Sequence, residues 1–146
     1  MKTKELKIEA PEGYEVDWDN SSNNVIRFKP IKKTITYEDI VKKLYPGKCY
    51  YINNNHTSER QISQLLYLNK LMNVAKYLNG DWEPDFTDRG QKKWYIDYNY
   101  EDSMLDTNFT YTYKHSSVHF KSEELARQAI EILGEDEVKK ALGIFE

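Results

Sequence analysis

The chain has 146 residues, a formal net charge of −3 and 31% charged residues, which fits one globular domain over residues 1–146 and lacks the basic excess of duplex-binding proteins. Aromatic residues make up 14% of the chain and offset a low hydrophobic content of 39%. Cys49 is the only cysteine, which excludes an intramolecular disulfide. Because no apolar run reaches the length of a signal peptide or a membrane span, we predict a cytoplasmic protein.

Short strands are predicted in the N-terminal third of the chain, over residues 5–9, 14–18 and 25–29, where apolar and polar residues alternate. A Pro-Glu-Gly turn and a polar run of Asp, Asn and Ser separate them. Thr36 is placed to cap a helix over residues 37–44, whose first turn carries two carboxylates. Residues 49–52 are a further candidate strand.

The longest predicted element is a helix over residues 58–79. Thr57 or Ser58 can cap its start, and Gly80 stands where a left-handed residue ends many helices. Its apolar residues cover an arc of roughly 180° when they are placed at 100° per residue. So wide an arc predicts that this helix is the centre of the core and is buried on more than one side.

Residues 93–113 alternate strongly and predict an antiparallel hairpin, followed by a strand near 117–121 after a slip in phase. Ser122 can cap a helix over residues 122–133, and a second short helix follows through residue 142. The predicted fold class is therefore α+β. We expect one antiparallel sheet, made of the N-terminal strands, the hairpin and the 117–121 strand, packed on the long helix and the C-terminal helix.

The segment between residues 82 and 94 is the best candidate for a binding surface. Aromatic side chains beside arginine or lysine can stack on a base and hold a phosphate, and tryptophan and arginine are common at protein interfaces. The alternative is structural, with Trp82 and Phe86 fixing the connector to the end of the long helix. The candidate partner- or ligand-binding residues are Trp82, Asp85, Phe86, Arg89, Lys92 and Lys93.

The sequence contains no recognisable catalytic motif or metal-binding motif. No nucleophile motif or glycine-rich phosphate loop occurs, and the acidic clusters lack the spacing of a calcium loop. His115 and His119 are four residues apart, but the region reads as strand and turn, where that spacing does not place two ligands on one face. We therefore expect no catalytic residue, no metal and no cofactor, and we expect the histidines to lie on the surface or in turns.

Four stretches of the chain resemble, in order and spacing, a group of small proteins encoded by phages, prophages and mobile elements of gut bacteria. They are residues 6–17 (LKIEAPEGYEVD), 82–86 (WEPDF), 93–96 (KWYI) and 118–126 (VHFKSEELA). The resemblance covers most of the chain and is weakest over residues 17–56. The group has no settled activity, so the resemblance carries over no catalytic residue.

The resemblance implies a bacterial host cell and a function by binding. The first expectation is a non-enzymatic binding protein that acts on a host or phage protein, for example as an antagonist of a host defence protein. The alternatives are a protein that sequesters a nucleotide, and a structural or regulatory phage protein. Duplex nucleic acid and membranes are not expected as partners.

Overall fold

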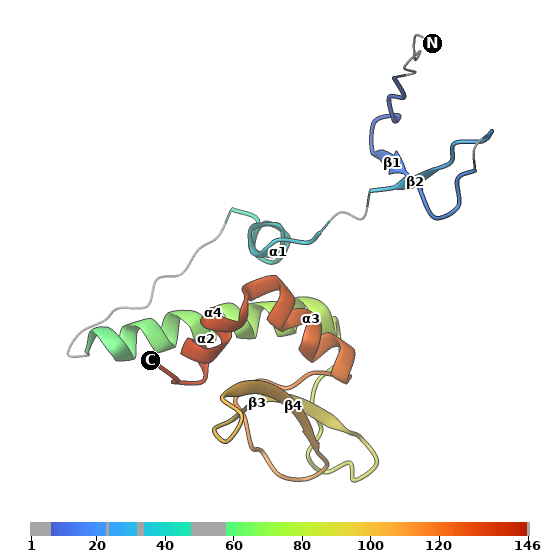
Figure 1. Cartoon of the computed structure of the whole chain (residues 1–146). Coiled ribbons are helices and arrows are strands. Elements are labelled where there is room, and N and C mark those ends of the chain that lie inside the picture. Colours follow the sequence, from blue (N-terminus) through green and yellow to red (C-terminus); the bar gives the residue numbers. More distant parts are fainter. Residues whose placement is uncertain (1–6, 23, 32–33, 48–57, 146) are drawn as a thin grey trace. The chain divides into compact units, whose positions relative to one another are not determined.

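A computed structural model describes residues 7–22, 24–31, 34–47 and 58–145. The chain divides into two compact units, unit 1 over residues 1–34 and unit 2 over residues 35–146, and each is described by itself. Helices and two-stranded antiparallel sheets both occur, so the predicted α+β class is confirmed (Figure 1). That residues 1–146 act as one domain stays a prediction.

Unit 1 is built on a small sheet of β1 (Tyr14–Val16) and β2 (Phe28–Pro30), which pair antiparallel with Tyr14 opposite Pro30. The strand β1 lies within the predicted segment 14–18, and β2 overlaps the end of the predicted segment 25–29; both are shorter than predicted. Glu15 and Lys29 face each other across the pair and form an exposed ion pair at 3.6 Å. No described residue of unit 1 is buried, so this hairpin has no core of its own.

Two predicted strands of the N-terminal part of the chain do not appear among the strands that the structure describes. The strand over residues 5–9 is wrong as far as the structure describes it, because residues 7–9 form no strand. The candidate strand over residues 49–52 lies outside the described residues.

The expected single sheet is instead two separate sheets, in which β1 pairs with β2 and β3 with β4. Short loops cost less closure entropy than the long connection that one shared sheet would need.

The first two helices of unit 2 begin where their caps predict. In α1 (Tyr37–Leu44), Thr36 accepts a hydrogen bond from the Asp39 amide, and the Asp39 carboxylate accepts one from the Thr36 amide. In α2 (Glu59–Asn79), Ser58 and Gln61 form the same reciprocal pair. Such capping boxes satisfy amide groups that have no partner inside the helix.

The helix α2 is the central element of unit 2, as predicted. It contacts α1, α3 (Glu123–Leu133) and α4 (Glu135–Ala141), and Figure 1 shows it running beneath α1 and beside α4. A half-buried ion pair between Lys70 and Glu137, with 2.9 Å between nitrogen and oxygen, joins α2 to α4. Its apolar arc is not fully covered, because Leu65 and Met72 remain exposed.

The predicted hairpin is confirmed as β3 (Lys93–Asn99) and β4 (Met104–Thr110). Asn99 shapes the turn, since its side-chain oxygen accepts hydrogen bonds from the amides of Glu101 and Asp102. The strand predicted near 117–121 is reduced to a single bridge, in which Phe120 and Trp94 exchange two backbone hydrogen bonds. The hydroxyl oxygen of Ser116 accepts a hydrogen bond from the Val118 amide. That amide is therefore not available to pair with a neighbouring strand.

The core of unit 2 lies between the helices and one face of the hairpin, where α3 contacts both β3 and β4. Asn79, the last residue of α2, fixes the chain after the hairpin through two side-chain hydrogen bonds of 2.9 Å, to the His119 carbonyl and from the Lys121 amide. The buried apolar side chains come from all of these elements: Ile40, Leu71, Val74, Ala75, Ile96, Leu105, Val118, Phe120, Ala126, Ala129, Val138 and Ala141.

Candidate functional site

The connector between α2 and β3 is held by its own polar groups. The Asp85 carboxylate accepts hydrogen bonds from the Thr87 amide at 2.8 Å and the Thr87 hydroxyl at 2.6 Å. These bonds lower the pKa of Asp85 below its ordinary value. The Asp85 amide in turn donates to the side-chain oxygen of Gln91 at 2.7 Å. Asp85 is thus placed to shape the connector through hydrogen bonds inside it.

Lys93, another predicted site residue, is fully buried. Its ammonium group donates three hydrogen bonds, to the backbone carbonyls of Asp88 at 2.7 Å, Gln91 at 2.8 Å and Tyr111 at 2.8 Å. All three ammonium protons are therefore used inside the protein. Lys93 ties the connector to the chain that follows β4 and offers no free donor to a ligand.

Trp82 and Phe86 lie together in the wall of an open hollow of about 670 Å³. Its walls are formed by the end of α2, the connector and the loop over residues 114–119. Met72 and Lys76 come from α2, and Lys114 comes from the loop. Two of the six predicted site residues therefore meet at one concave surface, and we call it the α2 hollow.

His119 also lines the α2 hollow, and it is 6% exposed. The Phe86 ring stands edge-on to its imidazole, with 5.2 Å between ring centroids. Its Nε2 atom is buried and has no hydrogen-bond partner among the described residues. Burial, together with the positive charges of Lys114, His115 and Lys93, lowers the pKa of His119 to about 4.

The depressed pKa of His119 predicts that stability declines in mild acid. Between the ordinary value of 6.5 and about 4, the unfolded chain binds a proton that the folded imidazole does not. The free energy of unfolding therefore falls as the pH drops through this window, at a rate approaching about 1.4 kcal/mol per pH unit, and this group causes no further loss below it. Urea unfolding at several pH values between 7 and 4.5 measures the decline.

A variant isolates the contribution of His119 to this decline. His119→Phe keeps a ring against Phe86 and removes the titrating group, so its unfolding free energy should fall less steeply over the same window. His115→Phe, at an exposed ring nearby, should keep most of the steep fall, because burial is the largest cause of the lowered His119 pKa and the charge of His115 is a smaller one. Equal slopes for His119→Phe and the native chain would show that this imidazole does not drive the effect.

The remaining aromatic side chain of the segment, that of Trp94, lies on the face of the hairpin that also carries Ile96, opposite to the face of Lys93. Trp94 and Phe109 are paired across the strands with 5.0 Å between ring centroids, and Tyr111 stands edge-on to Phe109 at 5.5 Å. The Lys92 ammonium lies 4.4 Å from the centroid of the Phe109 ring, a cation–π contact. We call Lys92, Trp94, Phe109 and Tyr111 the aromatic ladder. Phe109 is 41% exposed and Tyr111 40% exposed, whereas Trp94 also packs against the core.

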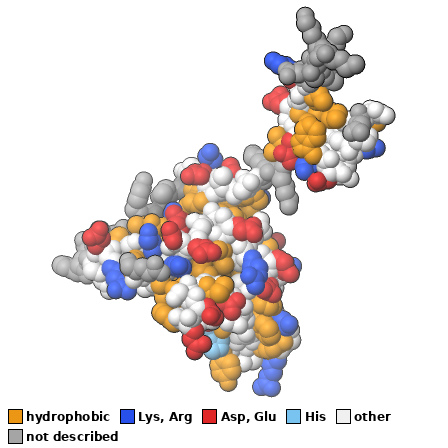
Figure 2. Space-filling view, in the orientation of Figure 1, with side chains coloured by type: hydrophobic (Ala, Val, Ile, Leu, Met, Phe, Trp, Pro, Cys, Tyr) orange, Lys and Arg blue, Asp and Glu red, His pale blue; other side chains and the backbone are white. Residues whose placement is uncertain are grey.

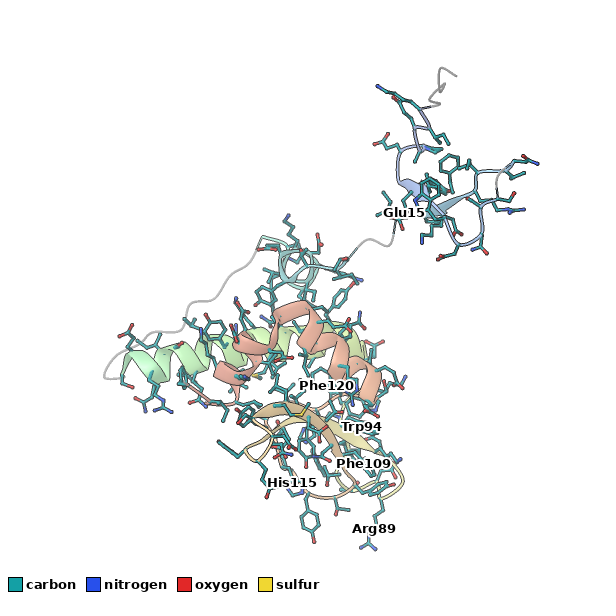
Figure 3. All side chains as sticks on the ribbon, viewed as in Figure 1. Glu15, Arg89, Trp94, Phe109, His115 and Phe120 are labelled. Atoms are coloured by element: carbon teal, nitrogen blue, oxygen red, sulfur yellow. The ribbon has the colours of Figure 1, made fainter. Side chains whose placement is uncertain are left out.

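Arg89 is exposed and forms no ion pair with another described residue, and the same is true of Lys92. Figure 3 shows Arg89 extending from the connector away from the fold, at the end of the hairpin where Trp94 and Phe109 lie. Figure 2 shows hydrophobic side chains next to a basic tip at this end of unit 2. Lys92 in the ladder and Arg89 in the connector before it are thus two cations that lack an acidic partner in the described part of the chain.

The structure divides the predicted site into three parts: the α2 hollow, the aromatic ladder, and residues that hold the connector. Phe109 and Tyr111 were missed by the sequence prediction, although their alternation with threonines placed them on one face of a strand. Only the strand register shows that this face is shared with Trp94. His119 was also missed, because no local signal marks its burial beside Phe86.

No group of three or more His, Cys, Asp or Glu residues able to hold a metal ion occurs within the described ranges. None of the described helices is both long and apolar enough to cross a membrane. The chain matches no known protein-family model, no curated protein sequence and no solved structure. The resemblance to small phage proteins therefore stays a prediction.

Proposed function

We propose that this chain is a non-enzymatic binding protein, encoded by a phage or a related mobile element, that acts on a host or phage protein. The aromatic ladder carries the proposal, because the exposed rings of Phe109 and Tyr111 stand beside the Lys92 ammonium, and Arg89 extends from the connector at the same end of the hairpin (Figure 3). Tryptophan, tyrosine and arginine contribute most of the binding energy at many protein interfaces. A host defence protein is the partner that the resemblance to phage proteins favours.

The chemistry of the ladder indicates what the partner presents. Phe109 and Tyr111 can bury apolar area against a partner, and Trp94 supports them from the core side. Arg89 and Lys92 have no acidic partner among the described residues, so a carboxylate-bearing surface would complement them. We therefore expect an acidic protein surface with an apolar centre, bound more weakly as the salt concentration rises.

Affinity capture with matched variants tests this proposal. The native chain, Phe109→Ala and the double variant Arg89→Glu, Lys92→Glu are immobilised and exposed to lysates of phage-infected and uninfected bacteria. We expect one protein to be captured by the native chain and lost with both variants, since truncating an interface hot spot costs at least about 2 kcal/mol, or about thirtyfold in affinity. Its affinity is then measured with the purified partner.

Tyr100→Ala is the matched control, because Tyr100 lies on the same hairpin, is 74% exposed and is outside the ladder. This variant should capture the partner as the native chain does, and circular dichroism should show every variant folded. Capture that survives both ladder variants would contradict the proposal. So would the absence of any captured protein, or a partner that is nucleic acid.

A further inference from the structure

We propose that the α2 hollow is a second binding site, and that it takes a mononucleotide, an aromatic base carrying a phosphate. The site is separate from the aromatic ladder, because neither Phe109 nor Lys92 lines it. Its volume of about 670 Å³ lies within the range of roughly 300–1,000 Å³ typical of small-ligand sites. Three features of its walls indicate this ligand.

The first feature is a pair of aromatic side chains. Trp82 and Phe86 both come from the connector and both line the hollow. Both are partly exposed, so their rings are open to a ligand. Met72, which is 50% exposed, adds a soft apolar side chain from α2. A planar base can stack on such a surface, and stacking on an aromatic ring is worth about 1–3 kcal/mol per base.

The second feature is the charge on the walls facing the connector. Lys76 on α2 and Lys114 in the loop both line the hollow and are exposed. The charged neighbours that act on the His119 imidazole are all basic, and Lys114 is the strongest of them. The acidic lining residues, Asp81 and Glu83, both belong to the connector. An anionic group is therefore attracted to the side of the hollow formed by α2 and the loop.

The third feature is the buried imidazole of His119. Its Nε2 has no hydrogen-bond partner among the described residues, and an unpaired buried polar atom costs stability. Because Nε2 is shielded from solvent, a ligand reaches it only after a neighbouring side chain shifts. Phe86, edge-on to the imidazole at 5.2 Å, is the side chain placed to do so. A ligand atom bound to Nε2 would satisfy a group that the protein leaves unpaired.

Calorimetric titration of the full chain with AMP, GMP, CMP and UMP tests the proposal. We expect at least one of them to bind, and the matching nucleoside, which lacks the phosphate, to bind at least tenfold more weakly. Trp82→Ala should weaken binding about tenfold to a hundredfold through lost stacking. Lys114→Glu, a change at an exposed loop residue that leaves the core intact, should weaken the nucleotide and not the nucleoside.

The controls are Trp18→Ala, which removes a 71% exposed tryptophan of unit 1, and Lys92→Glu, which reverses a charge outside the hollow. Both should bind the nucleotide as the native chain does. The proposal is overturned if none of the four nucleotides binds at millimolar concentration, or if Lys114→Glu binds with unchanged affinity. If Trp82→Ala loses nucleotide binding but still captures the partner, and Phe109→Ala loses capture but still binds the nucleotide, the two sites are separate.

Discussion

Lys93→Met is expected to lower the free energy of unfolding of unit 2 by about 3 kcal/mol. Methionine is similar in length to lysine and fills the same buried space, but it cannot donate to the carbonyls of Asp88, Gln91 and Tyr111. Three carbonyl oxygens would then face an apolar side chain. Urea unfolding followed by far-ultraviolet circular dichroism measures the loss.

Lys92→Met is the matched control for this prediction, because it removes the same charge from the neighbouring position, where the side chain is exposed. Its contact with the Phe109 ring is a surface interaction, so the change should stay within about 1 kcal/mol. If Lys93→Met proved as stable as Lys92→Met, the three carbonyl bonds would contribute nothing net. Lys93 would then not be the residue that holds the connector to the chain after β4.

Phe120→Ala is expected to cost about 4 kcal/mol, since truncating a buried phenylalanine removes its burial and leaves a cavity. Phe120 is 0% exposed, and Figure 3 shows it at the helix side of the hairpin. Its backbone bonds to Trp94 do not involve the side chain and remain possible in the variant. The cost is therefore assigned to packing, and the same urea unfolding experiment measures it.

Phe109→Ala provides the comparison, because the same truncation at a ring that is 41% exposed should cost only about 1 kcal/mol. The two variants together separate core packing from surface contacts on one hairpin. Equal losses would mean that the ladder is part of the core, and the capture experiment with Phe109→Ala would then report on folding. A small loss for Phe109→Ala leaves that experiment a test of binding.

The helices were predictable because their signals are local. Thr36, Ser58 and Ser122 each accept a hydrogen bond from a backbone amide three residues later, and a cap of this kind depends on a few neighbouring residues only. The hairpin was predictable for a similar reason, since alternation shows which residues share a face. The strand predicted near 117–121 failed because Ser116 competes for a strand amide, and alternation does not register that competition.

The candidate site was predicted only as a segment. The sequence placed six candidate residues within twelve positions, but it could not show that Trp82 and Phe86 join a hollow while Lys92 joins the opposite face of the hairpin. Nor could it show that Lys93 is buried, because a lysine in a strand is usually exposed. One of the three carbonyls around the Lys93 ammonium belongs to Tyr111, which lies after β4, and a local sequence pattern does not show that contact.

By itself, then, the sequence determined the α+β class, the helix starts set by caps and the hairpin within residues 93–113, all of which depend on residues close together in the chain. The tertiary structure alone decided which faces are covered. Asn73 falls on the polar side of α2 by periodicity, yet it is buried, because its amide bonds the hydroxyls of Tyr37 and Tyr45. Burial of this kind depends on how α1 docks on α2, and no local pattern encodes that contact.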